Sequence, residues 1–197
     1  MRNIDIYIHI GLPKTSSTYL QEFFFPKLAL KHIAFNPKEI MDIIHELILR
    51  LDSYENLSEH ELKKSSEKIY SFLINKSINK LVISEEAFTI KKYQFIYKDK
   101  ISFLNSIFKN PKFILIIREQ VSWIRSLYKQ AIHQQNIKNI NEFIELENVN
   151  SDKLDCINVN YLDYFELIRH IRDVSSNQEH LIFFYENYLS DKEKYLK

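Results

Sequence analysis

Glycine, cysteine and tryptophan each occur only once in this chain of 197 residues. Because Cys156 is the sole cysteine, no disulfide forms within the chain. The longest strongly apolar runs, such as residues 113–117, are far too short to cross a bilayer. The amino terminus also lacks the basic and apolar segments of a signal peptide. We therefore predict no transmembrane segment and a cytoplasmic, reducing location.

The chain also lacks an excess of charge of either sign. Lysine and arginine number 27, aspartate and glutamate 26, and the formal net charge is +1. This balance gives no reason to expect a broadly basic surface, so we predict no nucleic-acid partner. Hydrophobic residues make up 45% and charged residues 27%, which is typical of a globular chain. The length suits one domain, which we predict over residues 1–197, and it leaves the oligomeric state open.

Apolar residues in the chain alternate between strand-like and helical spacing. Residues 58–61 also form a capping box, a signal for the start of a helix. Strands that alternate with helices predict an α/β fold, a three-layer domain whose central, mainly parallel sheet is flanked by helices. The predicted strands are residues 4–10, 80–84, 112–117 and 180–185, and the predicted helices are Thr15 to Leu30, 40–51, 58–73, 97–108, 121–132, 161–171 and a last one opened by Ser190–Glu193. Residues 146–158 are predicted to be a surface loop.

Three groups of chemically active residues follow predicted strands. They are Gly11–Thr18, Ser84–Glu86 and the segment that begins at Arg118. Ligands of parallel α/β sheets bind beyond the carboxyl ends of the strands, so we expect these groups to meet at one edge of the sheet.

The first group has the composition of an anion-binding loop. Gly11, the only glycine, predicts a tight turn of the backbone after the strand. Backbone N–H groups at a helix start, neighbouring hydroxyls and the charge of Lys14 suit a phosphate-like anion. A Walker A loop reads G-x-x-x-x-G-K-[ST], and here the lysine comes too early. The pattern therefore disfavours an ordinary ATP or GTP kinase loop.

The segment PKTSSTYL at residues 13–20 resembles the 5′-phosphosulfate loop of sulfotransferases. These enzymes use 3′-phosphoadenosine 5′-phosphosulfate (PAPS), and their loops read roughly P-K-[ST]-G-[ST]-[ST]. In this sequence Ser16 stands where glycine is usual. The resemblance implies a fold similar to that of P-loop NTPases. It implies that the 5′-phosphate and sulfate are held by Lys14, Thr15, Ser16, Ser17 and Thr18.

A second segment, REQVSWIRSLY at residues 118–128, resembles the part of the family that binds the 3′-phosphate. Arg118 ends a predicted strand and Ser126 follows eight residues later on a helix. The family pattern, RxPxxxxxSxY, has a proline that this chain lacks. The resemblance implies that Arg118 and Ser126 bind the 3′-phosphate, which a guanidinium fork and a hydroxyl can do.

A third segment, LIFFYENYLSD at residues 181–191, resembles the late family strand that ends in Tyr-Glu. By this resemblance Tyr185 borders the adenine of the cofactor. Tyr19 stands where cytosolic members carry a tryptophan, and it would stack on the same base.

The resemblance implies transfer of a sulfuryl group from PAPS to an acceptor hydroxyl, which needs a general base. Glu85 is the favoured base and Glu86 the second candidate, while His32 and Glu39 are alternatives. Lys14 would neutralise charge on the leaving oxygens. We predict no metal, because His9, His32, His45 and His60 share no zinc spacing.

The implied activity is that of a PAPS-dependent sulfotransferase that acts on a glycan or glycolipid acceptor. Family members commonly continue beyond the equivalent of Lys197, so the chain is either a short variant or a piece of a longer protein. Two alternatives stay open: a P-loop-type small-molecule kinase, and a non-catalytic nucleotide-binding module.

Overall fold

The computed structural model describes residues 4–91, 94–95, 97–135, 139–145, 157–158, 163–175 and 179–190. At its centre is a five-stranded sheet in the order β2-β3-β1-β6-β9, and all neighbouring strands in it are parallel. The strands are β1 (Asp5–Ile10), β2 (Ile33–Phe35), β3 (Lys80–Glu85), β6 (Lys112–Ile117) and β9 (Leu181–Phe184). The predicted α/β class, a parallel sheet flanked by helices, is confirmed.

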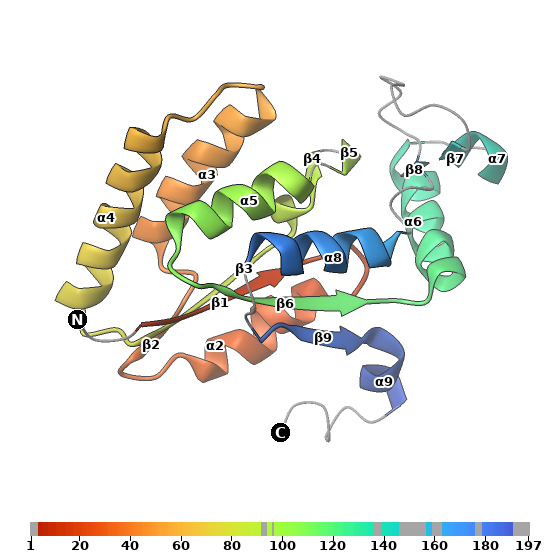
Figure 1. Ribbon diagram of the computed structural model, residues 1–197. Helices are drawn as coiled ribbons and strands as arrows, with labels where there is room; N and C mark the ends of the chain where they lie inside the picture. Colours follow the sequence, from red (N-terminus) through yellow and green to blue (C-terminus); the bar gives the residue numbers. More distant parts are fainter. Residues whose placement is uncertain are drawn as a thin grey trace.

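Helices cover both faces of the sheet (Figure 1). One face carries α3 (Lys38–Asp52), α4 (Glu59–Asn75), α5 (Tyr97–Ile107) and α8 (Tyr164–Val174). The other carries the continuous segment of α1 (Ser17–Tyr19), η1 (Leu20–Phe24) and α2 (Phe25–Leu28). Helices α6 (Gln120–Gln135) and α9 (Tyr185–Ser190) follow the carboxyl ends of β6 and β9. The smaller elements are η2 (Glu86–Phe88), β4 (Ile90–Lys91), β5 (Gln94–Phe95), α7 (Ile140–Phe143), β7 (Ile144–Glu145) and β8 (Ile157–Asn158).

The alternation in β1 divides its side chains between two cores. Ile6, Ile8 and Ile10 are fully buried under α3, α5 and α8, in the largest hydrophobic cluster. Tyr7 and the residues beside it in the sheet face the opposite side, where they pack with Leu20 and other residues of the α1–η1–α2 segment. Period-two alternation in a central strand produces this division because successive side chains point to opposite faces.

The predicted helix from Thr15 to Leu30 is shorter and less regular than expected. It begins at Ser17, passes through the π-helical segment η1 and ends at Leu28. Pro26 accounts for the irregularity, because its missing N–H removes one i→i−4 hydrogen bond from the segment. The backbone N–H of Phe25 bonds instead to the carbonyl of Leu20, five residues earlier.

Several element boundaries differ from the predictions. Strand β2 was not predicted, because three residues at a sheet edge give too short a pattern. Tyr185 begins α9 rather than ending the last strand. Residues 157–158, predicted as part of a loop, pair with β7. The rest of the 146–158 loop, residues 161–162 of the predicted late helix, and the helix beyond Ser190 lie outside the described residues. The capping box at Ser58 and Glu61 is confirmed.

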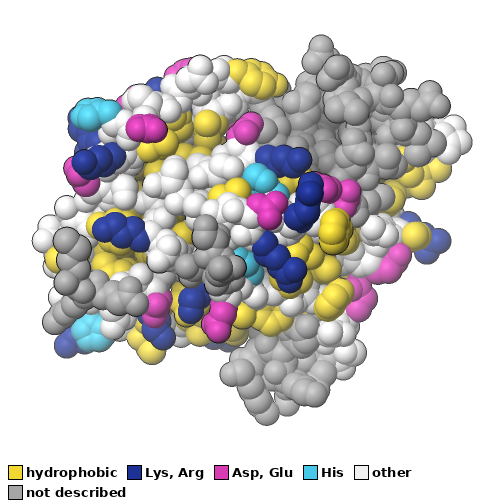
Figure 2. All heavy atoms as spheres, in the orientation of Figure 1, with side chains coloured by type: hydrophobic (Ala, Val, Ile, Leu, Met, Phe, Trp, Pro, Cys, Tyr) yellow, Lys and Arg dark blue, Asp and Glu magenta, His cyan; other side chains and the backbone are white. Residues whose placement is uncertain are grey.

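Charges of both signs share the surface shown in Figure 2. Over α5 and α8, basic and acidic side chains lie side by side, and Glu166 pairs with Arg169 at 2.7 Å. Among the described residues, no helix is long and apolar enough to cross a membrane.

Candidate active site

The loop between β1 and α1 is held in shape by its own hydroxyl groups. The carbonyl of Leu12 accepts hydrogen bonds from Thr15 Oγ1 at 2.6 Å and Ser17 Oγ at 3.1 Å. Both side chains are buried, whereas Ser16 is half-buried and Thr18 is exposed. Thr15 and Ser17 therefore shape the loop through their hydroxyl groups.

The turn of the loop depends on two left-handed residues, and neither is glycine. Lys14 has φ 63° and Ser16 has φ 67°. Glycine adopts this conformation without strain, whereas a residue with a Cβ atom does not. The backbone at Ser16 thus explains why glycine is usual at this position of the loops that the sequence resembles.

Gly11 serves a purpose other than the predicted tight turn, because its φ angle is not positive. A Cβ atom at this position would lie 3.1 Å from Glu86 Cγ and 3.1 Å from Ser17 Oγ. The glycine therefore lets the end of β3 approach the loop, and this contact brings a carboxyl group next to the predicted anion site.

The β6–α6 connection and the start of α6 bind the same loop through two of its backbone carbonyl groups. Arg118 Nη1 donates to the carbonyl of Lys14 at 2.9 Å, and Trp123 Nε1 donates to the carbonyl of Pro13 at 2.6 Å. Arg118 Nε donates to Ser122 Oγ at 3.0 Å. The structure thus brings the two predicted motifs together. The sequence alone predicts no role for Trp123. That it is the only tryptophan in the chain is the one feature of the sequence that could have drawn attention to it.

Ser126 lies one helical turn beyond Ser122 on α6, so the two serines share a face of the helix. Ser122, which accepts a hydrogen bond from Arg118, thus lies on the same face of α6 as the predicted 3′-phosphate ligand Ser126. The guanidinium carbon of Arg118 lies 4.5 Å from the centre of the Tyr185 ring. This stacking joins the predicted phosphate ligand to the predicted adenine contact.

Three tyrosines form a rim beside the loop. The ring centres of Tyr185 and Tyr188 are 6.3 Å apart, and those of Tyr19 and Tyr188 are 5.9 Å apart. Tyr19, 38% exposed, also contacts Phe23. The sequence reading missed Tyr188, although it follows Tyr185 by one helical turn, where side chains share a face.

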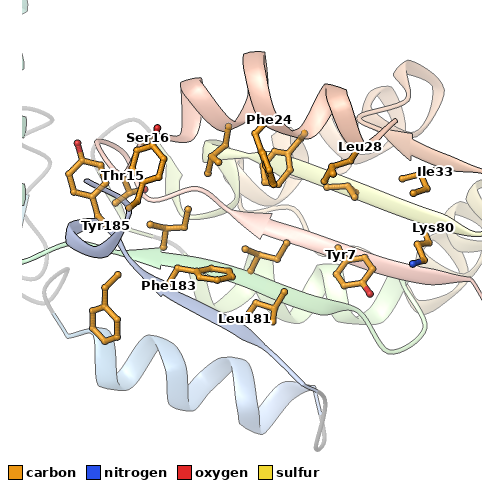
Figure 3. Close-up of a pocket in the computed structure, with 17 residues that line it drawn as sticks. Tyr7, Thr15, Ser16, Phe24, Leu28, Ile33, Lys80, Leu181, Phe183 and Tyr185 are labelled. Carbon is orange, nitrogen blue, oxygen red and sulfur yellow. The ribbon is translucent and has the colours of Figure 1, made fainter. Parts of the chain in front are cut away.

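The tyrosine rim lies at one end of a groove with a volume of about 400 Å³ between the α1–η1–α2 segment and the sheet. Figure 3 shows Thr15, Ser16 and Tyr185 at this end and Tyr7 and Lys80 at the other. The middle of the groove is apolar, with side chains such as Phe24, Leu28, Leu181 and Phe183. Apolar walls with a few polar groups at one end are typical of small-molecule sites.

The two candidate carboxyl groups face different surroundings. Glu85 Oε2 lies 3.2 Å from His45 Nε2 on α3, and Glu85 Oε1 accepts from the N–H of Ala87 at 3.3 Å. Glu86 contacts the Ser17 hydroxyl, and burial raises its pKa. The charge of Glu85 also raises the pKa of Glu86, whereas Ser17 and Lys14 lower it. Glu86 is therefore the carboxyl group that the structure places at the loop.

The alternative bases lie elsewhere. His32 precedes β2 and bonds to the carbonyl of Ser77 at 3.0 Å, near the amino end of β3. The loop lies at the carboxyl end, so the structure does not bring His32 to it. Glu39 is exposed in the first turn of α3. No group of three or more metal-ligating side chains occurs in the described parts of the chain.

The fold is similar to that of a solved sulfotransferase. A crystal structure of a sulfotransferase from Alicyclobacillus acidocaldarius aligns over 98% of this chain and 77% of its own, with a TM-score of 0.60 and 11% identity. A sulfotransferase domain from the curacin biosynthetic pathway aligns over 98% of this chain and 71% of its own, with a TM-score of 0.48 and 13% identity. No protein-family model and no curated protein matches the chain.

Proposed function

We propose that this chain binds PAPS and transfers its sulfuryl group to an acceptor hydroxyl. The observation that carries the proposal is the contact between the two motifs. Arg118 bonds to the backbone of Lys14 and stacks on Tyr185, so loop, guanidinium and aromatic rim belong to one site. When bound, PAPS supplies a sulfuryl group that moves to the acceptor oxygen as its bond to the 5′-phosphate breaks.

The residues at the site fit such a nucleotide. A guanidinium has five N–H donors, and two of those in Arg118 bond to other described residues. The other N–H groups, on a guanidinium that also stacks on Tyr185, suit the 3′-phosphate together with Ser126. Backbone N–H groups of residues 16–18 and the charge of Lys14 suit the 5′-phosphosulfate.

The aromatic rim suits the adenine. Tyr185 and Tyr188 border the groove beside the loop, and Tyr19 contacts Tyr188. Flat aromatic rings bind a planar base through offset or tilted stacking. In the nucleotide the ribose joins the base, the 3′-phosphate and the 5′-phosphosulfate, and Tyr185 lies beside both Arg118 and the loop.

We propose Glu86 as the group that takes the proton of the acceptor hydroxyl. It contacts the loop at Ser17, and burial raises its pKa, which makes its ionised form a stronger base. Glu85, the base favoured by the sequence, faces His45 instead. For the acceptor we propose a sugar hydroxyl of a glycan or glycolipid, by the sequence resemblance alone. We also propose a cytoplasmic site of action, on the composition and terminal pattern given in the sequence analysis.

Calorimetry and thermal denaturation with 3′-phosphoadenosine 5′-phosphate (PAP) test the proposal. At a concentration of about 100 times Kd, PAP should raise the melting temperature by about 5–10 °C. Arg118→Ala should abolish this shift. Arg125→Ala, which removes an exposed arginine of the following helix α6, should keep it.

ADP, AMP and ATP with Mg²⁺ serve as comparison ligands. Preference for PAP over ADP isolates the contribution of the 3′-phosphate. A response to ATP with Mg²⁺ that exceeds the response to PAP would replace the proposal by the kinase alternative. If none of the four nucleotides binds, the chain is not a PAPS-dependent enzyme.

A further inference from the structure

Strand β2 stops pairing with β3 just before the candidate carboxyl groups of Glu85 and Glu86. Along β2 the last backbone bond runs from Asn36 N to the carbonyl of Val82, at 3.0 Å. The next residue, Pro37, has no N–H, and it is the N-cap of α3, where the chain leaves the sheet. Ser84 would therefore have unpaired backbone groups on this side, which is costly for a buried residue.

The side chain of Asn36 replaces the missing strand. Its Oδ1 accepts from the N–H of Ser84 at 2.8 Å, and its Nδ2 donates to the carbonyl of Ser84 at 3.0 Å. An amide side chain can make both bonds because it carries the same donor and acceptor as a peptide group. Asn36 reaches Ser84 from a left-handed backbone with φ 40°. Such strain persists only where the surroundings hold it.

Two further elements bind Ser84. Gln21 Nε2, on η1, lies 3.1 Å from Ser84 Oγ and 3.3 Å from its carbonyl oxygen. His9 Nδ1, on β1, lies 2.7 Å from Ser84 Oγ. Both His9 and Ser84 are buried. Contacts from β1, from the helix that follows the loop, and from the β2–α3 turn thus converge on one residue.

Ser84 directly precedes Glu85 and Glu86. Beyond Ser84, the chain is fixed at two more points: Thr89 Oγ1 donates to the carbonyl of Gly11 at 2.9 Å, and Lys100 Nζ donates to the carbonyl of Ala87 at 2.7 Å. The contacts at Ser84 and these two define the distance between the carboxyl group of Glu86 and the loop.

We propose that Asn36 and Gln21 are positioning residues, which hold the end of β3 so that Glu86 stays against the phosphosulfate loop. The inference deepens the proposed function and rests on it, because it concerns the proposed base. Asn36 links the strand end to α3, and Gln21 links it to the helix that begins at the loop. Neither residue touches the reacting groups.

The test uses Asn36→Gly, because glycine accepts φ 40° and the substitution removes the side chain that carries the amide. Carboxyl ¹³C NMR titration of the nucleotide-free protein reports the pKa of Glu86, and Glu86→Gln identifies the signal. In the parent protein the pKa should lie above that of an ordinary glutamate. In Asn36→Gly and in Gln21→Leu it should move back toward the ordinary value as the carboxyl group gains water.

Asn110→Gly is the matched control, since Asn110 is an exposed residue with φ 51°. It should leave the pKa of Glu86 unchanged. With PAPS and an accepted hydroxyl, Asn36→Gly should lower kcat by about 10- to 100-fold, the cost of a misplacement near 1 Å. The KM for PAPS should stay within about twofold.

An unchanged Glu86 pKa in a folded Asn36→Gly protein would overturn the inference. If Asn36→Gly does not fold, the Gln21→Leu titration decides by the same criterion. The NMR result does not require nucleotide, so it is separate from the failure of the proposed function, which appears as absence of PAP binding to the parent protein.

Discussion

The left-handed backbone at Ser16 predicts that Ser16→Gly stabilises the protein. Ser16 has φ 67° and ψ 21°, a conformation that costs a residue with a Cβ atom about 1–2 kcal/mol. Glycine removes this cost, but it gives the unfolded chain extra freedom worth about 0.5–1 kcal/mol. The difference is a gain of about 0.5–1 kcal/mol in the free energy of unfolding.

Urea denaturation followed by circular dichroism measures this gain. Ser77→Gly is the matched control, because Ser77 has φ 55° in the exposed turn after α4. Both variants should raise the free energy of unfolding by the same amount, and the melting temperature by about 1–4 °C. A loss of stability in both would refute the strain argument.

The two variants should differ in nucleotide binding. The Cβ atom of Ser16 lies in the loop that we propose for the 5′-phosphosulfate, so its removal should tighten PAP binding by about two- to fivefold, or at most about 1 kcal/mol. Ser77→Gly should leave the affinity unchanged. Weaker binding by Ser16→Gly would show that the serine hydroxyl contacts the nucleotide, and that the loop differs in use from the glycine loops it resembles.

Two further predictions concern the titratable groups. Glu86→Gln should slow sulfuryl transfer by about 10²- to 10⁴-fold without weakening PAP binding. Glu85→Gln should keep a rate of sulfuryl transfer within about tenfold of the parent protein. The reverse order of rates would assign the base to Glu85. Burial lowers the pKa of His9 to about 4, so the unfolded chain binds its proton more readily and stability falls as pH drops from about 6.5 to 4. Between pH 7 and pH 5 the loss should be about 2 kcal/mol in urea titrations, and His9→Asn should remove most of it. An equal loss in His9→Asn would assign the acid sensitivity to other groups.

The sequence was sufficient for four of the five strands of the sheet, all except β2, and for the position of the candidate site at their carboxyl ends. The alternation in β1 and the apolar run in β6 are strong local signals, and parallel strands bring their carboxyl ends to one edge. Residues such as Lys14 and Arg118, 104 positions apart in the chain, are therefore in contact as predicted. Their roles toward a nucleotide stay predictions.

The sequence was insufficient where a role depends on where an element ends. Glu85 is still part of β3, while Glu86 begins η2, and this one-residue step turns one carboxyl group toward α3 and the other toward the loop. Nothing in the pattern VISEEAF marks that step. The role of Asn36 was also invisible, because it depends on the neighbouring strand in space as well as on Pro37 in the sequence.

The position of Glu86 joins two requirements that oppose each other. An ionised carboxylate beside the loop would repel the nucleotide that we propose to bind there, yet only the ionised form accepts a proton from a hydroxyl. Burial raises the pKa of Glu86, and this weakens the repulsion because a larger fraction of the group is neutral. Lys14 acts in the opposite direction and favours the charge. A small shift of the carboxyl group relative to Ser17 and Lys14 would alter both effects together. In the arrangement that we propose, contacts from β1, η1 and the β2–α3 turn hold the end of β3 and so keep the pKa of Glu86 constant. A mobile turn could not do this.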